Sequence, residues 1–257
     1  MTDDILLSQT RGAITTLTLN APATINALST QMLIRLGAAL DAIAASPVRV
    51  VILRAAGRNF CAGHDLREIQ GYRSAPDHGA AAFQALFSRC AAVMQQIAAL
   101  PQPVVAEVQG IATAAGCQLA ASCDMVVAAE TARFGVNGVN IGLFCHTPLV
   151  ALSSKIAPAQ AFELAATGEF IPAARAQALG LVTRLAPPET LSEATQSLAE
   201  TLAGKLPSAL TSGKRAAARS LAGAYDRATA AMVENLLNPD TAEGIAAFLA
   251  KRPPVWA

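Results

Sequence analysis

The stretch at residues 104–124 can do chemistry through its backbone rather than its side chains. It reads V-V-A-E-V-Q-G-I-A-T-A-A-G-C-Q-L-A-A-S-C-D, and its β-branched start predicts a buried strand. From 113 to 116 no side chain is larger than threonine, so a ligand can approach the backbone closely. A helix that begins near Ala115 leaves its first N–H groups unpaired, where they can polarise a carbonyl oxygen. Close packing alone is the alternative explanation for so bare a turn.

A second candidate, His64, lies in the loop R-N-F-C-A-G-H-D-L, which follows a predicted buried strand at 48–54. An imidazole titrates near neutrality, so His64 can hold or move a proton. The alternative is a histidine that is hydrogen-bonded within its loop. Glu107 lies in the strand that leads to Ala115, and we expect it to pair with an arginine.

The elements that must position these residues are alternating strands and helices, followed by helices alone. Strands are predicted at 13–20, 48–54, 104–108, 125–129 and 180–183. Helices are predicted after an N-cap at Ser29, at 80–100, in the 148–168 region and at 172–179, and 134–144 reads as a loop. From residue 190 onward leucines, including Leu221, follow helical spacing with no strand signal. We expect stacked, roughly parallel sheets, with a core at 1–195 and a helical region at 196–257 that packs on the core or on a neighbouring subunit.

Composition excludes several classes of function. Hydrophobic residues make up 53% of the 257 residues and charged residues 14%, which predicts buried subunit interfaces. A net charge of +1 offers no basic field for nucleic acid. The uncharged run at 134–154 contains two Asn, a His and a Pro, and is a poor bilayer span.

Two further expectations concern cysteines and location. The acidic start shows no secretory signal, so we expect a cytoplasmic protein with reduced thiols. Five cysteines without paired spacing and three histidines without ligand spacing predict no metal site.

Four segments, found in order along the whole chain, together resemble the crotonase (enoyl-CoA hydratase/isomerase) superfamily. They are L-N-A-P-A-T-I-N-A-L at 19–28, F-C-A-G-H-D-L at 60–66, V-Q-G-I-A-T-A-A-G-C-Q-L at 108–119 and E-G-I-A-A-F-L-A-K-R at 243–252. The resemblance implies an α/β fold, the crotonase (ClpP-like) spiral of repeated ββα units with a C-terminal helical trimerisation region. It also implies a homotrimer or dimer of trimers that acts on acyl-CoA thioesters in fatty acid metabolism, with no separate cofactor.

The resemblance also assigns site residues. The family's oxyanion hole consists of two backbone N–H groups, which correspond here to those of His64 and Ala115, and it stabilises a thioester enolate. An oxyanion hole made of backbone amides tolerates changes of side chain. The family's CoA contacts correspond to the 23–27 loop with Ala23 and Ala27, and to Ala62, His64, Asp65, Leu66 and Lys251. Lys251 is expected to meet a phosphate or the pantetheine, and a solvated lysine is the alternative.

The sequence departs from the family at both catalytic glutamates. Gln118 stands at the first position and Gly138 at the second, in F-G-V-N-G. Neither can exchange a proton, so the pattern argues against ordinary syn-hydration and against isomerisation. Besides His64, Cys145 and His146 follow G-L-F where family members often face the acyl group. Adjacent residues of an extended segment point opposite ways, so we expect one of the two in the pocket; packing under a helix start is the alternative.

Three functions therefore remain open. The first is an enoyl-CoA hydratase-like lyase that works through an enolate. The second is a decarboxylase, because G-H-D also resembles the methylmalonyl-CoA decarboxylase branch, which lacks both glutamates but has a tyrosine where Cys145 stands here. The third is a non-catalytic acyl-CoA binder or a scaffold for a partner.

Overall fold

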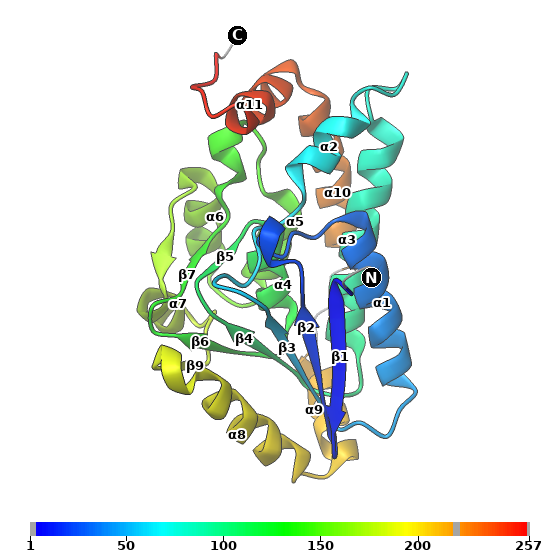
Figure 1. Cartoon of the computed structure of the whole chain (residues 1–257), viewed down its shortest axis with the longest axis vertical. Helices are drawn as coiled ribbons and strands as arrows, with labels where there is room; N and C mark the ends of the chain where they lie inside the picture. Colours follow the sequence, from blue (N-terminus) through cyan, green and yellow to red (C-terminus); the bar gives the residue numbers. More distant parts are fainter. Residues whose placement is uncertain (1–3, 218–221, 256–257) are drawn as a thin grey trace.

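The computed structural model describes residues 4–217 and 222–255, so Leu221 lies outside the described residues (Figure 1). Two sheets form its centre. The larger sheet contains, in spatial order, β1 (Leu6–Arg11), β2 (Ile14–Leu19), β3 (Val50–Ala55), β4 (Val104–Val108), β6 (Met125–Ala129) and β9 (Arg184–Ala186). The smaller sheet contains β5 (Ile111–Thr113), β7 (Arg133–Gly135) and β8 (Ile171–Pro172).

The larger sheet is parallel except at its first strand. β1 and β2 are antiparallel neighbours, and every later pair of this sheet is parallel. β4 is buried on both faces, as expected for a central parallel strand. An isolated parallel bridge between Cys61 and Ala112 extends the smaller sheet. β4, β5 and a helix, then β6, β7 and further helices, form the repeated strand–strand–helix unit, so the α/β expectation is confirmed.

Helices cover both sheets. They are α1 (Thr30–Ala44), α2 (Leu66–Tyr72), α3 (Ala80–Ala99), α4 (Ala115–Ser122), α5 (His146–Ser153), α6 (Pro158–Thr167), α7 (Ala173–Leu179), α8 (Leu191–Ala203), α9 (Pro207–Ala217), α10 (Ala222–Leu237) and α11 (Pro239–Leu249). Three short 3-10 helices are η1 (Pro22–Thr24), η2 (Asn137–Ile141) and η3 (Pro188–Thr190). None of the described helices is both long and apolar enough to cross a bilayer.

Most predicted elements are present, and the differences have local causes. Ser29 caps α1 by accepting a hydrogen bond from the N–H of Met32, as predicted. The strand expected at 180–183 instead lies at β9, and Leu181 and Val182 are buried in the turn before it. β1 was not predicted because five of its six residues are exposed and no alternation shows. β5 and β7 have three residues each, too few to reveal a period.

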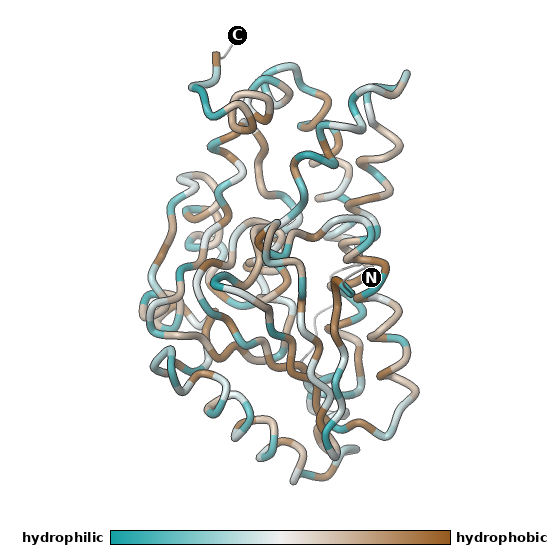
Figure 2. The backbone as a smooth tube through the Cα atoms, in the orientation of Figure 1, coloured by the Kyte–Doolittle hydropathy of each residue, from teal (hydrophilic) through white to brown (hydrophobic). Residues whose placement is uncertain are grey.

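The helical tail packs against the rest of the chain. α8 contacts β2, β3, β4, β6 and β9, so it covers one face of the larger sheet (Figure 1). Figure 2 shows hydrophobic residues along the central strands and an alternation of hydrophilic and hydrophobic residues along α8. α10 packs on α3 and α5, and α11 packs on α2 and η2. Residue 195 lies within α8, and a division of the chain at that point stays a prediction.

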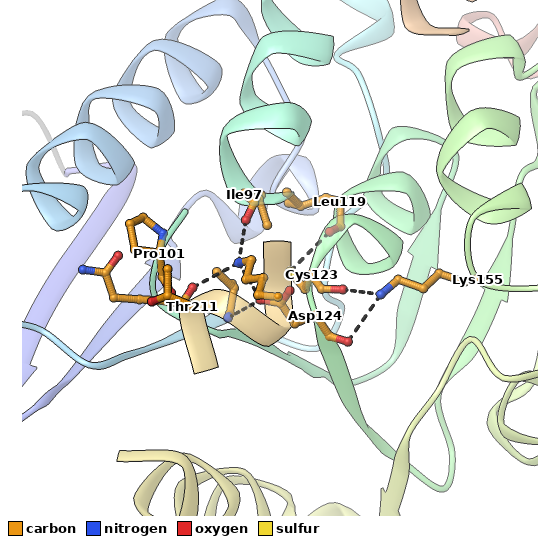
Figure 3. Close-up of polar contacts among 10 residues, drawn as sticks. Ile97, Pro101, Leu119, Cys123, Asp124, Lys155 and Thr211 are labelled. Carbon is orange, nitrogen blue, oxygen red and sulfur yellow. Dashed lines mark hydrogen bonds and ion pairs between the residues drawn. The ribbon is translucent and has the colours of Figure 1, made fainter. Parts of the chain in front are cut away.

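A partly buried ion pair joins α9 to the centre of the molecule (Figure 3). The Nζ of Lys214 lies 2.7 Å from Oδ2 of Asp124 and also donates to the carbonyls of Ile97 and Gln102. The same Oδ2 accepts the N–H of Val104, the first residue of β4, at 2.7 Å. One lysine therefore ties α9 to the end of α3 and to the residue that follows α4.

The cysteines are all free and buried, which confirms the expectation of unpaired thiols. Burial raises the pKa of four of them to about 12 and that of Cys145 to about 11.

Candidate functional site

A cavity of about 550 Å³ lies where the loops that follow β2, β3, β5 and β7 meet the C-terminal helices. Phe248 and Leu249 of α11 close it on the side of the tail. Nine residues named from the sequence line this one cavity: Ala23, Ala27, Ala62, His64, Asp65, Leu66, Ala115, Gly138 and Cys145. Gln118, His146 and Lys251 do not line it.

Asn26 shapes the first loop of the cavity. Its φ is 52°, a left-handed conformation that asparagine tolerates better than most residues. The wholly buried side chain accepts the N–H of Ala21 at 2.9 Å and donates to the carbonyls of Ala56 and Asn59. This amide therefore holds the 21–27 loop against the loop that follows β3.

Two backbone hydrogen bonds join the same pair of loops nearer the cavity. The N–H of Leu28 donates to the carbonyl of Gly63 at 2.7 Å, and the N–H of Ala62 donates to the carbonyl of Ile25 at 3.0 Å. The residues expected to contact CoA thus share one wall because their backbones are paired.

The start of α4 depends on a strained residue, Ala114. Its φ of 48° and ψ of −124° are unusual for a residue with a Cβ, and its N–H donates to the carbonyl of Gly135 at 2.9 Å. This conformation turns the chain from β5 into α4, so that Ala115 becomes the first residue of the helix. The N–H of Ala115 has no intrahelical acceptor and lies at the positive end of the helix.

Two glycines bring the loop of His64 onto that helix end. A Cβ on Gly63, whose φ is +90°, would lie 3.1 Å from the nitrogen of Ala115, and a Cβ on Gly116 would lie 2.3 Å from the carbonyl oxygen of Cys61. Within the described part of the chain, neither the N–H of His64 nor that of Ala115 donates a hydrogen bond. The residues that carry these two unpaired backbone donors therefore line the same cavity.

The His64 side chain has a structural setting that corrects the prediction of a near-neutral pKa. Its Nδ1 lies 3.1 Å from the carbonyl oxygen of Leu28, so Nδ1 carries the proton, because a carbonyl only accepts. The ring packs edge-on against Phe87, and Nε2 is buried with no partner among the described residues. Burial lowers the pKa of His64 to about 4, although Leu28 and Glu68 act in the opposite direction. The imidazole is therefore neutral at pH 7 and is not a general acid there.

The two positions of the family's glutamates supply no proton-transfer group. Gln118 is wholly buried, and its Oε1 accepts from the hydroxyl of Thr147 at 3.2 Å. Gly138 lines the cavity, but a Cβ there would lie 2.3 Å from the carbonyl oxygen of Leu143 and 2.9 Å from Sγ of Cys145. A glutamate at 138 would therefore require the backbone of Leu143 to move.

The remaining candidates separate. Cys145 lines the cavity while His146, the first residue of α5, lies in a groove between α5 and α10, so one of the adjacent pair faces the cavity as expected. Nδ1 of His146 lies 2.9 Å from the carbonyl oxygen of Phe144, and burial lowers the pKa of His146.

Lys251 is exposed just beyond α11, and its contact with CoA stays a prediction. Glu107 accepts from the hydroxyl of Ser192 at 2.9 Å, and no arginine of the described residues forms an ion pair with it, so the expected arginine partner is not found there.

Two pairs of residues in this site were not found from the sequence. The hydroxyl of Thr113 donates to Oδ1 of Asn137 at 2.7 Å, and both residues line the cavity. These residues are 24 positions apart, and only the pairing of β5 with β7 brings them together. Residues 134–144 were predicted to form a loop, and that prediction did not indicate this contact.

The second pair holds the far wall of the cavity from the tail. Asn235 of α10 accepts the N–H of Phe144 at 2.7 Å and donates to the carbonyl of Gly142 at 3.1 Å. Thr241 of α11 donates to that same carbonyl at 2.9 Å and accepts from Asn235 at 3.1 Å. The C-terminal helices thus position the 142–144 segment, which lies between cavity residues Ile141 and Cys145.

Comparison with known proteins agrees with this geometry. Residues 9–257 match the model of the family described as enoyl-CoA hydratase/isomerase. The chain belongs to the enoyl-CoA hydratase/isomerase family. It is 41% identical over 98% of its length to the mitochondrial enoyl-CoA hydratase domain-containing protein 3 of Xenopus laevis, of which it covers 85%.

Solved structures of the enoyl-CoA hydratase/isomerase family show the same fold. An enoyl-CoA hydratase from Mycobacterium smegmatis is 44% identical, with a TM-score of 0.80 over 99% of both chains. Human enoyl-CoA hydratase domain-containing protein 3 is 38% identical, with a TM-score of 0.78 over 98% of this chain and 100% of that one. The expected crotonase fold is therefore confirmed.

The predicted cytoplasmic location is corrected by the same relatives. The Xenopus laevis protein is named as mitochondrial, as are the similar proteins from rat and human, and this contradicts the prediction from the acidic start.

Proposed function

We propose that the protein binds acyl-CoA thioesters and polarises the thioester carbonyl with the N–H groups of His64 and Ala115. One observation carries this proposal: two unpaired backbone amides line a single cavity, one of them at a helix N-terminus. Negative charge that develops on the thioester oxygen would be stabilised there, which is the electronic requirement for a thioester enolate.

The walls support binding of the CoA portion. Ala23, Ala27, Ala62, Asp65 and Leu66 form the side of the loops that follow β2 and β3. These short side chains leave the backbone accessible to an extended pantetheine. We propose that Lys251 contacts the phosphate end of CoA, because it is exposed and lies two positions after the cavity residue Leu249. A homotrimer or dimer of trimers remains part of the proposal.

The proposed chemistry is enoyl-CoA hydratase-like in its enolate, but it does not use two glutamates. Gln118 is sealed from the cavity and Gly138 has no side chain, so activation of water by the usual pair is not available. Neutral His64 has its Nε2 buried, and the Cys145 thiol is protonated at neutral pH because its pKa is about 11.

The test is an infrared difference spectrum of butyryl-CoA labelled with ¹³C at its thioester carbonyl. We expect the carbonyl stretch to move to lower frequency on binding, because two hydrogen bonds polarise the bond. Ala115→Pro removes one of the two donors at the first helical position, where no intrahelical N–H bond is lost. We expect this variant to keep its affinity for free CoA and to lose most of the frequency shift. A wild-type protein that binds butyryl-CoA without a shift, or an equal shift in the variant, would contradict the proposal.

A second candidate is decarboxylation of a malonyl-type thioester, and it rests on the charge of the cavity. Asp65 is the one acidic residue among the described lining residues, and its Oδ1 accepts the N–H groups of Arg67 and Glu68 at the start of α2. The single carboxylate among these residues is thus hydrogen-bonded at the start of α2, and the cation Arg67 lines the same cavity. In this reaction the C–C bond breaks, carbon dioxide leaves, its electron pair forms the enolate, and water supplies the proton; no base is required.

Products distinguish the candidates. The protein is incubated separately with crotonyl-CoA and methylmalonyl-CoA, and the thioesters are resolved by mass. Gain of water from crotonyl-CoA supports hydration, and loss of carbon dioxide from methylmalonyl-CoA supports decarboxylation. Tight binding without either product supports a non-catalytic acyl-CoA binder.

A further inference from the structure

A fixed side-chain amide lies in the cavity beside Gly138. Asn137, the first residue of η2, is half-buried and lines the cavity. Its Oδ1 accepts the hydroxyl of Thr113 at 2.7 Å, which anchors one end of the amide. Among the described residues, no hydrogen bond is donated by its Nδ2. The amide thus has one end anchored and a donor free for a ligand.

The surroundings of Asn137 are largely apolar. Ile141 of η2, Leu143 of the loop that follows it, Pro148 of α5 and Met232 of α10 line the same cavity as Asn137. A polar donor that a ligand desolvates without pairing costs more than one that finds an acceptor. An acyl group made only of carbon and hydrogen would leave Nδ2 unpaired. The amide therefore favours acyl groups that carry an oxygen acceptor over acyl groups that do not.

Its anchor places the amide near the two backbone donors. Thr113 is the last residue of β5 and precedes Ala115 by two positions, across the strained Ala114. Gly138, which follows Asn137, has no room for a Cβ, so no side chain at 138 stands between Asn137 and a ligand. A ligand whose thioester oxygen is held by His64 and Ala115 would bring its first acyl carbons toward Asn137.

We propose that Nδ2 of Asn137 donates a hydrogen bond to an oxygen acceptor on the third acyl carbon, so that the site prefers 3-oxoacyl or malonyl-type thioesters. This inference rests on the proposed binding of acyl-CoA. The shared chemistry is an acceptor oxygen at that carbon, as a ketone or as a carboxylate. Asn137 is then a specificity-determining residue rather than an acid or a base, because an amide does not exchange a proton at neutral pH.

The experiment compares dissociation constants for butyryl-CoA, acetoacetyl-CoA and malonyl-CoA by calorimetry. Butyryl-CoA and acetoacetyl-CoA differ by one oxygen, and malonyl-CoA replaces the ketone by a carboxylate. We expect the wild-type protein to bind at least one of the two oxygenated thioesters roughly 3- to 10-fold more tightly than butyryl-CoA. The tighter of the two identifies a ketone or a carboxylate as the acceptor.

Two variants test the residue. Asn137→Asp keeps the shape and the hydrogen bond from Thr113 but presents an acceptor, so the ratio of affinities for the oxygenated thioester and butyryl-CoA should fall to one or below. Thr113→Val keeps Asn137 but releases its amide, and the preference should shrink in the same direction. A merely structural role would weaken all three ligands alike and leave their ratios intact.

Each outcome decides the matter. Equal affinity of the wild-type protein for all three thioesters, or a preference that survives in Asn137→Asp, would overturn the role of Asn137 while leaving acyl-CoA binding in place. Failure to bind butyryl-CoA and free CoA as well would refute the proposed function itself, and this inference with it.

Discussion

Gly116→Ala tests whether the close contact between α4 and the His64 loop creates the pair of amides. The added Cβ would lie 2.3 Å from the carbonyl oxygen of Cys61 and 2.8 Å from its Cβ, against 3.4–4 Å for an ordinary contact. The loop must therefore retreat by roughly 1 Å, because backbone rather than a flexible side chain is in the way. Since His64 follows Cys61 by three residues, its N–H would move away from that of Ala115.

The expected cost divides into two measurable parts. Overpacking of this kind destabilises by about 1–3 kcal/mol, and replacing glycine in a helix returns at most about 1 kcal/mol. The free energy of unfolding in urea should thus fall by about 0–3 kcal/mol. The affinity for butyryl-CoA relative to free CoA should fall by about 2- to 10-fold, because a hydrogen bond to the neutral thioester oxygen is worth about 0.5–1.5 kcal/mol.

The matched control is Gly37→Ala in α1. A Cβ at this helical glycine would lie 3.4 Å from Oε1 of Gln96 and 3.7 Å from Cγ2 of Val93, which are ordinary contacts. We expect unchanged binding and equal or greater stability for this variant. If Gly116→Ala bound butyryl-CoA as well as the wild type, with the same carbonyl frequency, the spacing of the two amides would not matter and the reasoning would be refuted.

Two further predictions concern charge. Lys214→Met should lower the free energy of unfolding by about 1–3 kcal/mol, because it removes the ion-pair partner of the partly buried Asp124, whereas Lys205→Met at an exposed lysine should leave the urea midpoint unchanged. For His64, the folded pKa of about 4 lies below the ordinary histidine pKa of 6.5, so the unfolded chain binds the extra proton and stability is lost as pH falls from 6.5 toward 4. The stability lost through this group is about 3 kcal/mol. The free energy of unfolding in urea should therefore differ less between pH 7 and pH 4 for His64→Gln than for the wild type. Identical differences for the two proteins would exclude this role of His64.

Sequence patterns predicted correctly those features that depend on residues close together in the chain. The valines at the start of 104–124 predicted β4, and Ser29 predicted the start of α1, because burial and capping depend on neighbours in the chain. The small residues at 113–116 predicted a helix opening near Ala115, where α4 begins. The strained φ of Ala114 was not predictable, since a hydrogen bond to Gly135 on another strand helps to hold it.

Properties that depend on distant partners were missed or wrong. The pKa of His64 is set by burial among residues such as Leu28 and Phe87, which lie 36 and 23 positions away in the chain. Glu107 finds Ser192, 85 positions later, instead of an arginine. The contact between Thr113 and Asn137 exists only because β5 and β7 pair.

The hydrogen bonds of Asn235 and Thr241 give the helical tail a thermodynamic role in ligand binding. They join α10 and α11 to the 142–144 segment, so the tail and the cavity wall hold their shape together. By linkage, a ligand that binds only the ordered wall also stabilises the docked tail. Conversely, the free energy needed to order a loosened tail reduces the free energy of ligand binding by the same amount. Changes on α10 or α11 far from the ligand can therefore adjust affinity without altering a single residue that touches it.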